Sequence, residues 1–164
     1  MEQKLTSFAR PSYDGAFKTL ALIGFIAGSL DAMGPILVNG ASPAGMFKYI
    51  ASGAFGADEA FSGGGEMIAW GIFFHYFIAF SWTTFYFFLY PTVGFLQKNR
   101  FVSGVLYGIF VWAFMNRIVV PLSKIPQRPF ELKGALIGVS ILIVAIGLPI
   151  AILTQRYYSK RNKG

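Results

Sequence analysis

The stretch from Met67 to Tyr90 constrains the fold more than any other part of the chain. It reads MIAWGIFFHYFIAFSWTTFYFFLY, contains no Asp, Glu, Lys or Arg, and is about half aromatic. An α-helix rises about 1.5 Å per residue and the hydrocarbon core of a bilayer is about 30 Å thick, so roughly 20 apolar residues cross it. The pattern predicts a membrane-spanning helix that carries the only histidine of the sequence, His75.

At helical spacing, two kinds of side chain fall on different sides of this span. One side collects small and polar residues, namely Gly71, His75, Ala79, Trp82 and Tyr86. Another side is mainly phenylalanine, with Phe73, Phe77, Phe80, Thr84 and Phe87. We expect the first side to face other helices and the second to face lipid.

The composition is that of an integral membrane protein. Of 164 residues, 55% are hydrophobic and 13% are charged, and the mean hydropathy is +0.57. The sequence predicts one all-α membrane domain over residues 1–164 with four spans, at approximately 16–37, 67–90, 101–122 and 134–154. The net charge of +7 comes mostly from residues at span ends and in the C-terminal tail. We therefore expect the lipid bilayer and its anionic headgroups, not nucleic acid, as the partner of these charges.

The sequence offers little for metal binding or catalysis. It has no cysteine, which excludes disulfides, thiolate ligands and thiol nucleophiles. With a single histidine as well, we expect no metal and no cofactor. No nucleophile and base are arranged for catalysis, so we predict that the protein is not an enzyme. The run Gly63–Gly65 lacks the Gly-Lys-Ser/Thr ending of a phosphate loop and predicts a hinge instead.

The connection between the first two spans is about 29 residues long, which exceeds the usual length of a structureless loop. Ser42 suits a helix N-cap and Pro43 the first helical position. Met46, Phe47 and Ile50 follow as an apolar stripe. This pattern predicts a short interfacial helix at approximately 43–53 in the first outer loop.

An even number of spans places both termini on one side of the membrane. That side carries nine basic residues, namely Lys4, Arg10, Lys18, Lys98, Arg100, Arg156, Lys160, Arg161 and Lys163. The opposite side carries five, namely Lys48, Arg117, Lys124, Arg128 and Lys133. The positive-inside rule therefore predicts that both termini are cytoplasmic.

Three ionisable residues inside the spans share one depth. Counted from the outer ends of their spans, Asp31, His75 and Arg117 lie roughly 7 to 12 Å below the hydrocarbon surface. An isolated charge there costs at least about 2.5 kcal/mol, so partners are expected. The sequence predicts an intramembrane polar cluster of these three residues, which Asn116 and Glu66 would complete.

Each member also has a simpler interpretation. Arg117 can snorkel to headgroups, and it lies about 180° from Gly108 on its helix, away from the close-packing face. Asp31 can be protonated and bonded to backbone that Gly34 and Pro35 leave without partners. His75 can be a neutral hydrogen-bonding residue between helices. These alternatives remain open from the sequence.

Pairs of glycines four residues apart occur in three spans and let another helix approach closely. The pairs are Gly24/Gly28, Gly104/Gly108 and Gly134/Gly138. They exceed what one compact bundle requires. We therefore expect at least one pair to support a homo-oligomer or docking into a larger membrane complex.

Several positions resemble a known family. They are Ser42-Pro43, Met46-Phe47, Trp70, His75, Ser81, the small-residue start of the third span and Val120-Pro121-Leu122. Over roughly residues 20 to 125 the chain resembles the YagU-like small bacterial inner-membrane proteins. The resemblance implies a four-span protein of a family without an established activity, with a link to acid tolerance. The chain departs from the pattern at Asn116-Arg117, a place that can hold histidine.

These observations favour a non-enzymatic, multi-pass protein of the bacterial inner membrane, as a stress-related or accessory component. The alternative is a small proton or solute transporter or channel that works as an oligomer. Transport needs a continuous polar path. The inner halves of the spans offer only Ser81, Thr83, Thr84, Ser103 and Ser140 for such a path.

Overall fold

The computed structural model describes residues 13–126 and 129–161, and these residues form helices and connections without a strand. The basic residues Lys4, Arg10, Arg128 and Lys163, counted above for topology, lie outside the described residues. The elements in chain order are α1 (Tyr13–Asn39), α2 (Pro43–Phe55), α3 (Ala57–Ser62), α4 (Gly65–Leu89), α5 (Gly94–Lys98), α6 (Arg100–Phe114), η1 (Met115–Val119), α7 (Val120–Leu122), α8 (Leu132–Leu142), η2 (Ile143–Gly147) and α9 (Leu148–Arg161).

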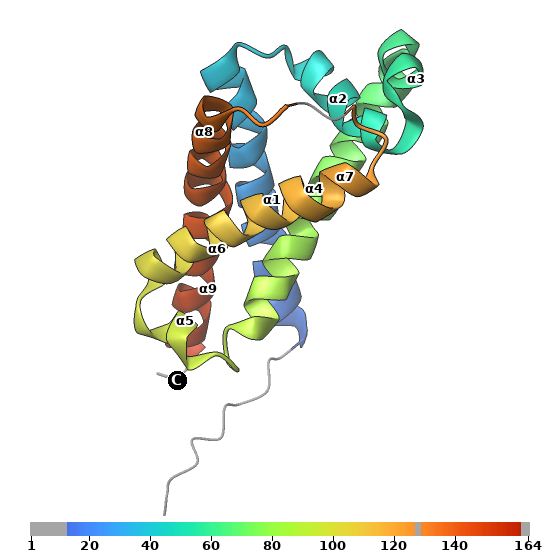
Figure 1. Cartoon of the computed structure of the whole chain (residues 1–164). Helices are drawn as coiled ribbons and strands as arrows, with labels where there is room; N and C mark the ends of the chain where they lie inside the picture. Colours follow the sequence, from blue (N-terminus) through green and yellow to red (C-terminus); the bar gives the residue numbers. More distant parts are fainter. Residues whose placement is uncertain (1–12, 127–128, 162–164) are drawn as a thin grey trace, which may run out of the picture.

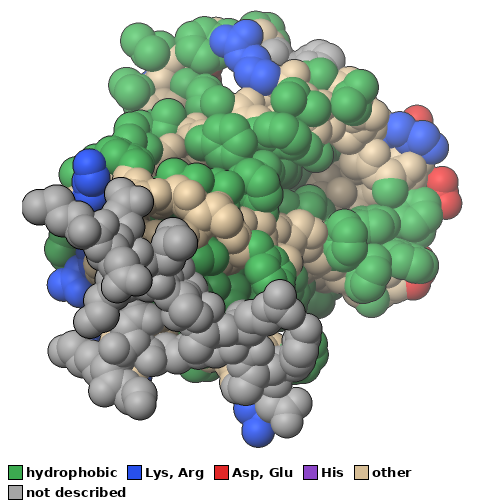
Figure 2. Space-filling model, turned by 90° about the horizontal axis from the view of Figure 1, so that it is seen from below, with side chains coloured by type: hydrophobic (Ala, Val, Ile, Leu, Met, Phe, Trp, Pro, Cys, Tyr) green, Lys and Arg blue, Asp and Glu red, His purple; other side chains and the backbone are tan. Residues whose placement is uncertain are grey.

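Four helical stretches are long and apolar enough to cross a membrane, which confirms the all-α membrane fold. They are Gly15–Asn39, Gly65–Leu89, Arg100–Leu122 and Leu132–Lys160. The start of α1 and the end of α9 lie at the lower end of the molecule, and the α1–α2 and α7–α8 connections lie at the upper end (Figure 1). Seen from below, the described surface is mostly hydrophobic, with charged side chains at a few places near its edge (Figure 2).

The third and fourth spans each contain a π-helical turn just before a proline. η1 ends two residues before Pro121, and η2 ends two residues before Pro149. A proline cannot donate to the carbonyl four residues earlier, and its ring clashes with that carbonyl. Each helix widens at this point, so that the Val120 N–H reaches Met115 O and the Leu148 N–H reaches Ile143 O.

Glycines let α1 pack closely against α4. The Phe80 ring occupies the space where a Cβ on Gly24 would lie. A Cβ on Gly28 would be 3.0 Å from the Tyr76 ring and 3.1 Å from Ala79 Cβ. Ser29 Oγ and Tyr76 Oη add a hydrogen bond of 2.9 Å. Gly24 and Gly28 therefore form a contact within the chain.

Glycines also mark the crossing of α6 and η2. A Cβ on Gly104 would be 3.0 Å from Gly147 O, and a Cβ on Gly108 would be 2.5 Å from Ile143 Cα. Gly147, which the glycine pairs did not include, faces both glycines of α6. In α8, a Cβ on Gly138 would be 2.9 Å from Trp112 Nε1, whereas Gly134 is exposed.

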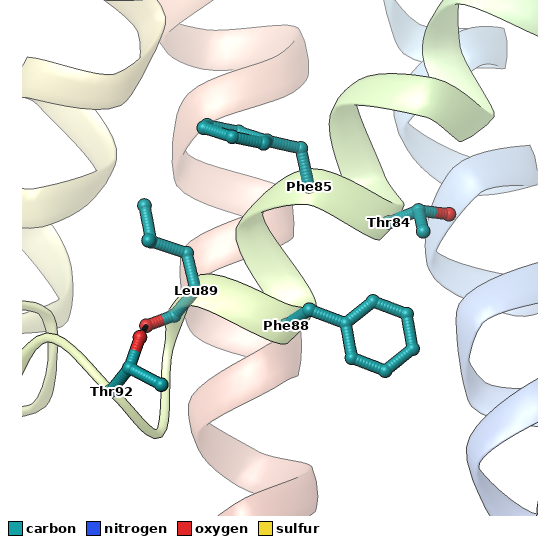
Figure 3. A pocket seen from close by; sticks show the side chains of 5 residues that line it. All are labelled: Thr84, Phe85, Phe88, Leu89 and Thr92. Carbon is teal, nitrogen blue, oxygen red and sulfur yellow. Dashed lines mark hydrogen bonds between the residues drawn. The ribbon is translucent and has the colours of Figure 1, made fainter.

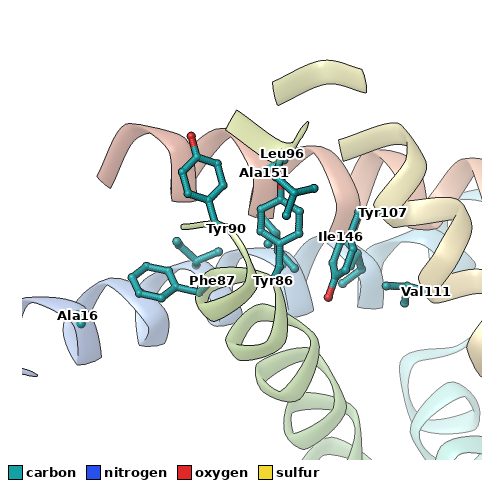
Figure 4. Close-up of a cluster of buried hydrophobic side chains, with 12 residues drawn as sticks. Ala16, Tyr86, Phe87, Tyr90, Leu96, Tyr107, Val111, Ile146 and Ala151 are labelled. Carbon is teal, nitrogen blue, oxygen red and sulfur yellow. The ribbon is translucent and has the colours of Figure 1, made fainter. Parts of the chain in front are cut away.

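A cluster of buried hydrophobic side chains lies where α1, α4, α5, α6, η2 and α9 meet (Figure 4). Its largest fully buried side chains are Tyr86, Phe87, Ile23, Ile150 and Val111. The expectation that Phe87 faces lipid is wrong: its ring is fully buried against Tyr157 and Tyr158 of α9, at 5.1 and 5.2 Å between ring centroids. Helix α9 continues to Arg161 and covers a second side of α4.

Candidate functional site

His75 projects from α4 towards α1 and is only 8% exposed. Its Nε2 lies 2.7 Å from the backbone oxygen of Gly28. Because a carbonyl oxygen can only accept a hydrogen bond, Nε2 carries a hydrogen and Nδ1 remains as the second ring nitrogen. Gly28 permits this bond because, without a side chain, it lets α4 approach the α1 backbone.

Asp31 follows Gly28 by three residues and therefore lies on the same face of α1. It is half-buried, and its carboxyl group interacts electrostatically with His75. Pro35 comes four residues after Asp31 and has no N–H, so the Asp31 carbonyl lacks its usual helical donor. The structure thus brings an acid and a histidine together from two helices. They lie at a point where α1 continues but lacks one backbone hydrogen bond.

Aromatic rings enclose the histidine. The Tyr76 ring meets it edge-on at 5.4 Å between ring centroids, and the Phe47 ring of α2 does so at 6.0 Å. Phe25 stacks on Tyr76 at 5.7 Å. Residues of three elements, α1, α2 and α4, therefore surround the imidazole and limit its contact with solvent.

The other residues of the expected cluster lie elsewhere. Arg117 is exposed in η1, and in the described ranges no acidic side chain pairs with it. Asn116 donates from Nδ2 to Trp112 O of its own helix at 2.9 Å. The packing face of α6 explains both positions, because Gly108 turns towards η2 and Arg117 lies on the other side of the helix.

Glu66 has a local role at the start of α4. Its Oε1 accepts a hydrogen bond of 2.6 Å from the Gly64 N–H, and the side chain is exposed. Lys48, which sequence reasoning did not assign to the cluster, donates from Nζ to Gly63 O at 2.6 Å and to Phe61 O at 3.3 Å. These bonds connect α2 to Phe61 near the end of α3 and to Gly63, which follows α3.

Several polar side chains of the spans bond to one another or to their own backbone, whereas the buried Thr154 Oγ1 of α9 has no hydrogen-bond partner among the described residues. Ser81, Thr83 and Ser140 each donate to the carbonyl four residues earlier, at 2.7 to 2.9 Å. Tyr86 Oη donates to Ser103 Oγ at 3.1 Å. In the part of the chain that the structure describes, these groups do not join into a path that leads to His75.

A shallow depression lies at the lower end of α4 (Figure 3). It is lined by Thr84, Phe85, Phe88, Leu89 and Thr92, all from α4 and the turn after it. Thr92 Oγ1 donates to Leu89 O at 2.8 Å and so is already satisfied. Because one helix supplies the whole lining and the phenylalanines point outwards, we assign this depression to the lipid-facing surface.

Among the described residues, no group of three or more His, Cys, Asp or Glu side chains is placed to hold a metal ion. Comparison with family models, curated proteins and solved structures finds no match. The resemblance to the YagU-like proteins therefore stays a prediction. The Asp31–His75 pair is the candidate site.

Proposed function

We propose that this multi-pass membrane protein is a non-enzymatic accessory or stress-related component of the bacterial inner membrane, and that its Asp31–His75 pair binds a proton. One observation carries the proposal: a buried histidine bonded to Gly28 O, with the acidic Asp31 three residues further along the same face of α1. Ionisable side chains inside membrane spans are costly, and they commonly mark proton or ligand sites.

The pair is suited to couple protonation to helix packing. His75 belongs to α4 and Asp31 to α1, and these helices touch through Gly24 and Gly28 with little space between them. Histidine changes charge near neutral pH, with an unperturbed pKa of about 6.5. A proton gained or lost between the two helices changes the charge at their contact. Such a coupling would suit a component that responds to acid, as the family resemblance implies.

A transporter or channel remains the second candidate. It has a site at a suitable depth, but it also needs a polar path across the membrane. The hydrogen bonds of Ser81, Thr83 and Ser140 to their own helices argue against such a path in one copy. Transport would therefore require an oligomer that builds the path between copies.

We place both termini in the cytoplasm, from the nine-to-five excess of basic residues at that end. The Asp31–His75 pair then lies in the outer half of the bundle. A reporter protein fused after Gly164 should indicate the cytoplasm. A periplasmic signal would reverse the orientation and move the pair to the inner half.

We also propose self-association or docking into a larger membrane complex. Gly24/Gly28 and Gly104/Gly108 already make contacts within the chain, so Gly134, which is exposed, is the glycine left for a partner. A Gly134→Leu variant should change the mass of the protein measured in lipid. A wild type that is strictly monomeric in lipid would exclude this part of the proposal.

Two measurements on the purified protein in vesicles test the function. A pH-sensitive dye inside the vesicles should report no proton flux beyond that of protein-free vesicles. The thermal stability of the wild type should change with pH more than that of His75→Gln, because the proposed proton site lies at the contact between α1 and α4. Proton flux that disappears in Asp31→Asn would instead favour the transporter, and an identical pH dependence in His75→Gln would exclude a proton site at His75.

A further inference from the structure

Helix α2 covers one side of His75. It is 13 residues long, too short to cross a bilayer, and it packs against the upper half of α4 (Figure 1). Its Phe47 places a ring edge-on to His75, and Phe47 backbone atoms occupy the space where a Cβ on Gly71 would lie. Met46, Ala51 and Ser52 of α2 are buried.

Helix α2 is flanked by a glycine on each side and is held by two hydrogen bonds to other segments. Gly40 and Gly56 flank the helix, and both have positive φ angles, of 64° and 98°. Such angles are strained for other residues, so glycine suits both positions, and its backbone can also adopt other conformations there. Two polar ties fix the helix between these glycines: Lys48 Nζ to Gly63 O at 2.6 Å, and the Lys124 N–H to Gly53 O at 2.9 Å.

We propose that α2 is a lid that opens about Gly40 and Gly56 and so controls the access of water and protons to His75. The inference rests on the proposed proton site and adds a way in which access to that site is regulated. When the lid is closed, Phe47 covers one side of the imidazole and α1 covers another. When it opens, Phe47 leaves the ring and the upper end of the bundle admits water to the pair.

A disulfide can lock the lid, because the chain has no cysteine of its own. A Cβ on Gly53 would lie 3.6 Å from Ser123 Cβ, which is within the spacing of disulfide-bonded cysteines. The double variant Gly53→Cys/Ser123→Cys therefore joins α2 to the segment after α7. The single variants Gly53→Cys and Ser123→Cys are the matched controls.

Access is measured by the reaction of diethyl pyrocarbonate with His75 in lipid nanodiscs. As the chain has one histidine, the absorbance of the modified imidazole reports a single site, provided that the affinity tag contains none. In the reduced double variant, we expect the lid to be open in roughly 0.1–10% of molecules. His75 should then react at about that fraction of the rate of free imidazole. Oxidation should slow the reaction at least about tenfold relative to the reduced form, and reduction should restore it.

Equal rates in the oxidised and reduced double variant would overturn the lid. Both forms share the same lipid-facing surface, so their ratio isolates the movement of α2. A second comparison stands if the disulfide does not form: Phe47→Ala should speed the modification of His75, and so should Phe55→Ala, because each substitution removes a ring that packs α2 against α4. Phe55 is on the same helix and packs on Trp70 and Phe74. An unchanged rate in Phe47→Ala would equally overturn the proposal.

Diethyl pyrocarbonate reacts with the neutral imidazole, so the two redox forms are compared at one pH, where proton binding changes both rates alike and their ratio reports access. A locked lid that protects His75 in a protein with no pH response would therefore retain the lid and exclude the proton site. Equal access in both redox forms of a protein that does respond to pH would exclude the lid alone.

Discussion

Replacing Gly71 by alanine should weaken the attachment of α2 to α4. The added Cβ would lie 2.5 Å from the carbonyl carbon of Phe47 and 2.8 Å from its Cα. These atoms belong to the backbone of a helix, so no side-chain rotation can relieve the contact. The whole of α2 must move away from α4.

The expected cost follows from this geometry. Inserting a methyl group into a packed interior typically costs about 1–3 kcal/mol, and a backbone that cannot yield places Gly71→Ala near 3 kcal/mol. Alanine in place of glycine in a helix interior stabilises the helix by about 1 kcal/mol, which offsets part of this cost. The net loss of about 2 kcal/mol corresponds to a Tm lower by roughly 4–8 °C for a chain of this size.

The assay is thermal unfolding of the purified protein in detergent, followed by tryptophan fluorescence. Gly65→Ala is the control, because Gly65 is on the same helix and a Cβ there meets nothing within 4 Å. Its Tm should stay within about 2 °C of the wild type, since surface substitutions usually change stability by no more than ±0.5 kcal/mol. If Gly71→Ala unfolds at the same temperature as Gly65→Ala, α2 does not pack on α4 as described.

Three further predictions concern the spans. Asp31→Asn and His75→Ala should each lower the Tm, and the double variant should lose less than the sum, by a coupling of roughly 0.5 to 2 kcal/mol; strict additivity would mean that the pair does not interact. Arg117→Gln should leave the Tm nearly unchanged in the same assay, because the Arg117 side chain is exposed. A fall in Tm as large as that of Asp31→Asn would instead indicate a buried ion pair. Gly147→Ala should lower the Tm by about as much as Gly71→Ala or more, since its Cβ would meet backbone atoms of Gly104 and Gly108; an unchanged Tm would contradict the close crossing of α6 and η2.

Much of the fold follows from the sequence, because membrane spans have a simple physical signature. Long uncharged runs must be helices, since lipid offers no partner for backbone N–H and C=O groups. The sequence also predicts Ser42 as the N-cap of α2. In the structure, Ser42 Oγ accepts a hydrogen bond of 3.1 Å from the Gly45 N–H. Helix α3 was not predicted, because its six residues are too few to show a periodic pattern.

The site was harder to read than the spans. Depth alone grouped Arg117 with Asp31 and His75, but depth does not say which side of a helix faces a neighbour. The partner of the histidine is a backbone carbonyl, Gly28 O, and such a partner leaves no side-chain signal in the sequence. The contact of Phe47 with His75 depends on how α2 folds back, which only the tertiary arrangement determines.

The hydrogen bond between His75 and Gly28 is the feature on which the site depends, and nuclear magnetic resonance can test it directly. With ¹⁵N-histidine and ¹³C-carbonyl glycine in lipid, the single histidine gives one pair of ring nitrogens. The bond of 2.7 Å predicts a hydrogen on Nε2, magnetisation transfer from Nε2 to one glycine carbonyl, and altered ring signals in Asp31→Asn. An Nε2 without hydrogen, or without transfer to any glycine carbonyl, would contradict the account.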